Sequence, residues 1–114
     1  MTITPAQIEQ RLKDLSHEVD DAQEGLKTAE VEYFTAKASY EIALAKSRLV
    51  LGSQGVKTIG EREDRALVIN EELAQRLAIA EAMVKAARGN SQRVREQVDI
   101  ARSIGTSVRA AMDL

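Results

Sequence analysis

The sequence predicts an all-α protein, a long antiparallel helical hairpin of the coiled-coil type that assembles into a helical homo-oligomer. Apolar residues recur in alternating steps of four and three in both halves of the chain, and one glycine-containing break separates the halves. Of the 114 residues, 44% are hydrophobic but only 3% are aromatic. Alanine supplies much of this apolar content, and it favours helices that approach one another closely. A single helical-hairpin domain over residues 1–114 therefore fits the composition.

The first predicted helix spans about residues 5–51. Thr4 and Pro5 form a typical helix start, because a threonine side chain caps the helix and proline is tolerated at its first position. Apolar or small residues then follow one another without interruption in a heptad seam. The seam comprises Ile8, Leu12, Leu15, Val19, Ala22, Leu26, Ala29, Tyr33, Ala36, Tyr40 and Ala43. We expect the two tyrosines to fill the core, with a base-stacking role as the alternative.

The second predicted helix spans about residues 59–112, after a loop at about 52–58. Gly52 and Gly55 break the first helix, and Thr58 with Glu61 forms a capping box that opens the second. Its seam comprises Leu73, Leu77, Ala80, Val84, Ala87, Ser91, Val94, Val98, Ala101, Gly105, Val108 and Met112. The register continues across Gly89-Asn90-Ser91, which favours a continuous helix, although a kink or a true turn stays open at this stage.

A turn centred near Gly55 sets the register of the predicted hairpin. It places Leu15 opposite Arg95 and Ala22 opposite Arg88, so that residues beyond about Ser103 overhang their partner helix. The overhang keeps its apolar character, and we expect it to meet another chain. Its apolar residues are Ile104, Val108, Ala111 and Met112.

A second apolar stripe accompanies each seam, and two helices of one hairpin cannot bury both. On the first helix it comprises Val31, Thr35, Ala38, Ile42, Ala45 and Leu49, and on the second Ile79, Met83, Ala86, Ile100, Ile104, Ser107 and Ala111. The sequence therefore predicts a homo-oligomer of undetermined number. The predicted interface residues are Ile42, Leu49, Ile100, Ile104, Val108 and Met112.

Catalytic chemistry has little support in the sequence. His17 is the only histidine and there is no cysteine, so no nucleophile–base pair of the usual kinds can be assembled. No phosphate-binding glycine motif occurs. The acidic clusters Asp20-Asp21 and Glu61, Glu63 and Asp64 could hold a metal, but acids near helix N-termini usually interact with the helix dipole. We expect no enzyme activity, no cofactor and no metal site. Because no signal peptide or membrane span is visible, we expect a cytoplasmic protein.

Four arginines stand seven residues apart near the end of the chain: Arg88, Arg95, Arg102 and Arg109. On one helix they form a nearly straight line with a spacing of roughly 10 Å. Residues 85–114 carry six basic and three acidic side chains, a net +3, whereas residues 1–84 carry a net −5. Arginine forks bind phosphates well, so the candidate nucleic-acid-binding residues are these four with Arg93 and Lys85.

A structural role of the arginine line is the alternative. All four arginines fall at the heptad e position, which flanks a coiled-coil seam and often forms salt bridges between helices. In an antiparallel pair e faces e, and the first helix offers only two acids there. Its e positions are Glu9, Ser16, Gln23 and Glu30.

The overall layout resembles the small helical phage recombination mediators of the UvsY type. The similar parts are Tyr40-Glu41-x-x-Leu44 before the glycine-containing loop, the capped restart Thr58–Glu61, and the segment Ala101-Arg102-Ser103-Ile104-Gly105. The chain also looks like small coiled-coil proteins encoded among phage replication and recombination genes. This resemblance implies an oligomer that binds single-stranded DNA and helps to load a recombinase, in the host cytoplasm.

Two functional hypotheses follow. The first is a non-enzymatic helical accessory of phage DNA recombination or replication, with single-stranded DNA and recombination proteins as partners and no membrane. The second is a structural or adaptor coiled coil, for phage assembly or host interaction, that makes no contact with nucleic acid.

Overall fold

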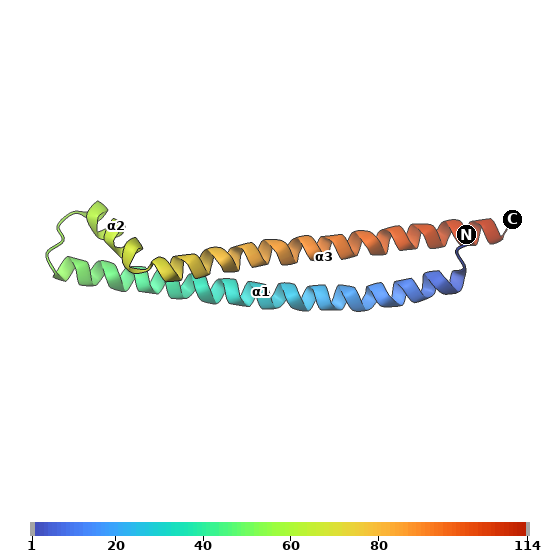
Figure 1. Ribbon diagram of the computed structural model, residues 1–114, viewed down its shortest axis with the longest axis horizontal. Coiled ribbons are helices and arrows are strands. Elements are labelled where there is room, and N and C mark those ends of the chain that lie inside the picture. The colour runs from blue at the N-terminus through green and yellow to red at the C-terminus, as the bar shows by residue number, and fades with distance from the viewer. Residues whose placement is uncertain (1, 114) are drawn as a thin grey trace. The chain divides into compact units, whose positions relative to one another are not determined.

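The computed structural model describes residues 2–113 and contains three helices (Figure 1). Helix α1 spans Pro5–Ser53, α2 spans Ile59–Ile69 and α3 spans Glu71–Met112. They contain 49, 11 and 42 residues, and no strand occurs among the described residues. The prediction of an all-α protein is therefore confirmed, whereas the homo-oligomer stays a prediction.

The chain divides into two compact units, and α1 and α3 pass through both. Unit 1 comprises residues 1–27 and 86–114, and unit 2 comprises residues 28–85. Unit 1 thus joins the beginning of α1 to the end of α3, and unit 2 contains the loop and α2. Each unit is described below by itself.

Helix α1 begins where the sequence predicts. The backbone amide of Gln7 donates to Thr4 Oγ1 at 3.2 Å, and the amide of Thr4 donates to Gln7 Oε1 at 3.0 Å. This reciprocal pair is a capping box, which satisfies amide groups that have no partner within a helix. Pro5 follows as the first helical residue, as expected from its missing N–H.

The loop after α1 turns at Gly55. This residue has φ of 88°, a left-handed conformation that glycine adopts without a steric penalty. Its amide donates to the carbonyl of Gly52 at 3.3 Å, and the amide of Val56 donates to the carbonyl of Leu51 at 3.1 Å. Helix α1 therefore ends in hydrogen-bonded turns at Ser53, two residues later than predicted.

Unit 2 has its core beside this loop. Leu44 and Leu51 of α1 pack with Val56 of the loop and Ala66 of α2, and Tyr40 contacts the same cluster. Tyr40 thus contributes to the core, as expected from its place in the seam.

Helix α2 is fixed to the loop at its first turn. Thr58 caps it by accepting a hydrogen bond from the amide of Glu61 at 3.3 Å, which is one half of the predicted capping box. The Glu61 carboxylate accepts from Arg65 Nη2 at 2.7 Å instead of from the amide of Thr58. Arg62 donates from Nε to the carbonyl of Val56, and its Nη2 lies 3.5 Å from the carbonyl of Lys57. These bonds satisfy loop carbonyls that have no partner in a helix.

The prediction of one continuous helix over residues 59–112 is wrong, because the chain leaves the helix at Asn70. Its side-chain Nδ2 donates to the carbonyl of Ala66 at 2.8 Å and to Ser47 Oγ of α1 at 2.9 Å. An asparagine amide that bonds locally to the backbone competes with helix continuation. Asn70 is buried, and the carbonyl of the same residue accepts the first hydrogen bond of α3, from Ala74 at 3.0 Å.

Unit 1 buries the predicted seams of both helices. Leu15 has no exposed surface, and Val94 is only 3% exposed. The other buried positions of these seams in unit 1 are Ile8, Ala22, Ser91, Ala101 and Gly105. Residues 89–91 are helical and Ser91 is buried, so the interpretation of this segment as continuous helix is confirmed.

The predicted overhang beyond Ser103 is wrong, because α3 packs on α1 further along than the turn-centred register allows. That register would place Arg102 opposite Ile8. Instead, a Cβ built on Gly105 would lie 3.1 Å from Ile8 Cγ2, and Val108 lines a pocket with Pro5 and Ile8. The turn-centred register holds only for an uninterrupted second helix, which the break at Asn70 rules out.

Candidate functional site

The four periodic arginines all lie on α3 within unit 1. Arg88, Arg95, Arg102 and Arg109 are exposed, and the helix is continuous between the first and the last of them. Their spacing of seven residues therefore places them along one edge of α3, roughly 10 Å apart. Unit 1 thus presents the row of guanidinium groups that the sequence predicts. We call these four residues the arginine edge.

The two auxiliary basic residues occupy different positions. Arg93 is also exposed on α3, and its Nη2 donates to Asn90 Oδ1 at 2.8 Å. Lys85 belongs to unit 2 and forms an ion pair with Glu81 at 3.7 Å, one helical turn away. Such exposed pairs contribute little to stability, so the lysine is readily available to other anions.

Three members of the arginine edge have no carboxylate partner among residues 2–113. Among residues 2–113, the guanidinium groups of Arg95, Arg102 and Arg109 form no ion pair and no hydrogen bond with another residue. Arg88 does have an interacting partner. Interhelical salt bridges, the structural explanation of the arginine edge, therefore do not account for three of its four members in the described part of the chain.

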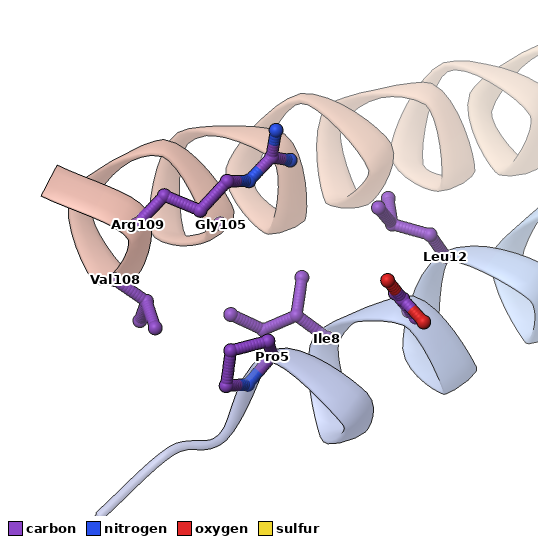
Figure 2. Close-up of a pocket in the computed structure, with 7 residues that line it drawn as sticks. Pro5, Ile8, Leu12, Gly105, Val108 and Arg109 are labelled. Atoms are coloured by element: carbon purple, nitrogen blue, oxygen red, sulfur yellow. The ribbon is translucent and has the colours of Figure 1, made fainter. Parts of the chain in front are cut away.

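The end of the arginine edge borders a small cavity between α1 and α3. Its volume is about 250 Å³, and both Glu9 and Arg109 line it. Their charged groups nevertheless form no ion pair, because the guanidinium of Arg109 lies back along α3 toward Gly105 (Figure 2). The remaining lining residues are Pro5, Ile8, Leu12, Gly105 and Val108. The absence of a side chain at Gly105 leaves room for this orientation.

The opposite flank of the helix pair in unit 1 carries the polar contact between the two helices. Arg11 of α1 reaches Gln97 Oε1 of α3 from Nη2 at 3.4 Å, and its Nη1 lies 3.7 Å from Glu18 Oε1. Arg11 and Gln97 both occupy heptad g positions, which face each other in an antiparallel pair. The two flanks therefore differ: the g flank bonds across the pair, whereas the guanidinium groups of Arg95, Arg102 and Arg109 on the other flank have no such partner among residues 2–113.

Aromatic side chains lie away from the arginine edge in sequence. Tyr33 and Phe34 of α1 contact each other edge to face, with ring centroids 5.3 Å apart and planes at 63°. Both belong to unit 2, and residues 85–114 contain no aromatic residue. The arginine edge can therefore provide charge and hydrogen bonds to phosphate, but not base stacking.

Most of the predicted interface residues are exposed in this structure. The exposed fractions are 56% for Ile42, 75% for Leu49, 60% for Ile100, 39% for Ile104 and 66% for Met112. Val108 differs, because it is half-buried in the cavity beside Pro5 and Ile8. Its apolar side chain is therefore partly covered by α1 of the same chain.

The sequence reading missed a further apolar surface on α2. Ala66 is the buried residue of this helix, whereas Ile59 and Val68 are 74% and 73% exposed, and Leu67 and Ile69 are also exposed. The signal was present in the sequence as three consecutive apolar residues, which no single helix face can bury. The run lies before Leu73, the first residue of the predicted seam, and it does not follow the four–three steps of that seam.

His17 is exposed on α1. Among residues 2–113, no group of three or more histidine, cysteine, aspartate or glutamate side chains is placed to hold a metal ion. Within the same residues, no helix is both long and apolar enough to cross a membrane.

Comparison of the chain with protein-family models, with curated proteins and with solved structures gave no match.

Proposed function

We propose that this protein is a non-enzymatic, self-associating helical accessory of phage DNA recombination or replication that binds single-stranded DNA along α3. The observation that carries the proposal is the arginine edge, in which Arg95, Arg102 and Arg109 are exposed and unpaired within the described chain. The phage context rests on the sequence resemblance to UvsY-type mediators alone.

The chemistry of the arginine edge supports a polyanion rather than a small anion as the ligand. Successive arginines are separated by a rise of roughly 10 Å along α3, which places them to contact separate phosphates of one chain. A phosphate-bearing chain can contact each in turn, since every guanidinium offers a planar fork of donors to two phosphate oxygens. A duplex strand carries a phosphate about every 3.4 Å, so the row spans several nucleotides.

Overall charge does not oppose this binding mode. The chain is acidic as a whole, with a net charge of −2, but the part of α3 in unit 1 carries five arginines and two acids. Screening limits the repulsion from distant acids to about 10 Å at moderate salt, so the local positive charge dominates at the arginine edge. We expect weak, salt-sensitive and sequence-tolerant binding, because no side chain is placed to read base edges.

Fluorescence anisotropy with a labelled single-stranded oligonucleotide tests this proposal. We expect binding at low salt that weakens steeply as salt is added, because bound arginines release counterions from the nucleic acid. A chain that does not bind the oligonucleotide even at low salt would not have the proposed function.

A second candidate function is a structural or adaptor coiled coil without nucleic-acid contact. It is favoured by the number of large apolar side chains left on the surface, including those of α2. Such a protein would still self-associate or bind a protein partner, but its anisotropy signal with DNA would stay flat. Measuring the association state and DNA binding separately distinguishes the two candidates.

A further inference from the structure

The second apolar stripe of α1 lies uncovered in unit 2. Val31, Ile42 and Leu49 are 59%, 56% and 75% exposed, and the smaller residues between them are exposed as well. The full stripe comprises Val31, Thr35, Ala38, Ile42, Ala45 and Leu49. Its steps of four and three make it a coiled-coil seam of its own, separate from the seam that packs within the chain. We call it the outer stripe.

We propose that the outer stripe is the contact through which two copies of this chain form an antiparallel, two-fold symmetric dimer. This deepens the self-association in the proposed function, and it is independent of DNA binding because it uses α1 of unit 2 and none of the arginine edge. Two features of the stripe favour a second copy of this chain as its partner: the sizes of its residues and the charges beside it.

The sizes of the residues suit antiparallel self-pairing. In one register Ala38 faces Ile42 of the second copy, and Thr35 faces Ala45 of the second copy. Val31 and Leu49 then meet at the two ends, and symmetry repeats every layer. The central layers therefore set the large Ile42 against the small Ala38, which fills space better than a parallel pair, where Ala38 would face Ala38 and Ile42 would face Ile42.

The charges beside the outer stripe are complementary in the same register. Glu32 of one copy faces Lys46 of the other, and symmetry produces the pair twice, with Ser39 facing Ser39 at the two-fold axis. Glu32 and Lys46 are exposed and form no ion pair with any residue among 2–113. Each charge is therefore available to the second copy.

The other flank of the outer stripe brings Phe34, Glu41 and Arg48 into contact with the second copy in the same register. There Phe34, which is 62% exposed, faces Arg48 of the second copy, an arrangement in which a guanidinium can lie on an aromatic ring. At the axis Glu41 faces Glu41, the one repulsive contact of this register. A parallel pair would instead set Glu41 against Lys46 and Glu32 against Lys27, but it would also bring Glu24, seven residues before Val31 on the same face, against Glu24 of the second copy. The double swap of Glu32 and Lys46, which restores attraction only in the antiparallel pair, and a substitution at Glu41 thus separate the two arrangements.

Sedimentation equilibrium of the full chain without DNA, at several concentrations, tests the proposal. We expect Glu32→Lys and Lys46→Glu each to weaken the dimer by about tenfold, because each reversal converts two attractive contacts into repulsive ones. The double variant Glu32→Lys/Lys46→Glu should recover most of the affinity. Glu41→Gln should tighten the dimer about twofold or more, since it removes the repulsion at the axis.

The matched control is Asp99→Lys, which reverses an exposed charge on α3 in unit 1, on a different helix from the outer stripe. It should leave the dimer constant unchanged, and circular dichroism should show the same helix content for every variant. A monomer at all concentrations would overturn the proposal, as would single reversals without effect or a double variant that does not recover. Weakening by Glu41→Gln would overturn the antiparallel register and favour the parallel one.

Crosslinking provides a second measurement that does not depend on the charges. The natural chain has no cysteine, so Ser39→Cys introduces a single thiol at the predicted axis. A short-armed bismaleimide should join two copies of this variant in high yield. The same substitution at Ser103, an exposed residue of α3 in unit 1, is the control and should crosslink poorly. Equal yields from the two variants would contradict the proposed axis.

Discussion

Gly105 of α3 packs so closely on Ile8 of α1 that a Cβ placed on the glycine would lie 3.1 Å from Ile8 Cγ2. Such a Cβ would be closer to Ile8 than in ordinary van der Waals contact. The two helices can therefore approach this closely at the end of unit 1 because residue 105 has no side chain. The contact also fixes the register of α3 on α1 within this unit. Replacing either residue should therefore affect stability in a way that the helix propensity of glycine alone does not explain.

Alanine substitutions at two helical glycines should have different effects. Gly25→Ala meets open space and should raise the free energy of unfolding by about 0.5–1 kcal/mol, because alanine favours a helix over glycine. Gly105→Ala should gain at least about 0.5 kcal/mol less, and Gly105→Val should cost about 1–3 kcal/mol from overpacking. Urea unfolding followed by circular dichroism measures all three. Equal gains for Gly25→Ala and Gly105→Ala would show that the contact with Ile8 is not tight.

The break between α2 and α3 should depend on the hydrogen bond from Asn70 to Ser47. Removing the buried amide with Asn70→Ala should lower the free energy of unfolding by about 1–3 kcal/mol, because the amide bonds both Ser47 and the carbonyl of Ala66. A double-mutant cycle with Ser47→Ala should give a coupling energy of about 0.5–1.5 kcal/mol. Additive effects of the two substitutions would mean that the side-chain pair contributes nothing.

Burial should decide the cost of apolar truncation. Leu15 has no exposed surface, so Leu15→Ala should lower the free energy of unfolding by about 2–4 kcal/mol through lost transfer energy and a cavity. Val68 is 73% exposed, and Val68→Ala should change the free energy of unfolding by no more than about 0.5 kcal/mol. Thermal and urea unfolding at one fixed protein concentration compare them. Similar costs for the two would contradict the placement of Leu15 at the centre of the helix pair in unit 1.

The type of cation on the arginine edge should matter as well as its charge. Arg102→Lys should keep the salt dependence of DNA binding and weaken the affinity about two- to fivefold, because lysine keeps the charge but loses the planar fork. Arg102→Gln should weaken binding further and reduce the slope of log affinity against log salt by about 0.7. Arg65→Gln is the matched control, since Arg65 lies on α2 and pairs with Glu61 at 2.7 Å. An equal effect of Arg65→Gln would indicate that the arginine edge is not a specific contact.

The sequence was sufficient to predict the helical class and the buried stripe of each helix, because both follow from local periodicity. The positions of the first seam from Ile8 to Ala43 are all buried or half-buried in the structure, as are those of the second from Leu73 to Val108. The helix starts at Pro5 and after Thr58 were also predictable, since capping depends on residues only three positions apart.

The break at Asn70 was not predictable from the same pattern. It depends on a contact with Ser47, which lies 23 residues earlier on another helix, and local helix preferences do not report such a contact. The register error at Ile8 and Gly105 has the same origin, because hairpin pairing was counted from an uninterrupted second helix. The arginine edge, by contrast, was visible in the sequence as a seven-residue repeat, but only the structure shows which of its members have no carboxylate partner among residues 2–113.

The most direct test of the proposed function is a salt titration of single-stranded DNA binding, with the natural chain compared with the triple variant Arg95→Gln/Arg102→Gln/Arg109→Gln. If these three arginines contact phosphates, log affinity should fall with log salt at a slope of about −2 to −3 for the natural chain, and the triple variant should lose about 2 of that slope. Sedimentation without DNA should show that the variant still associates with itself. Absence of binding by the natural chain at low salt, or an unchanged slope in the triple variant, would contradict DNA binding by the arginine edge.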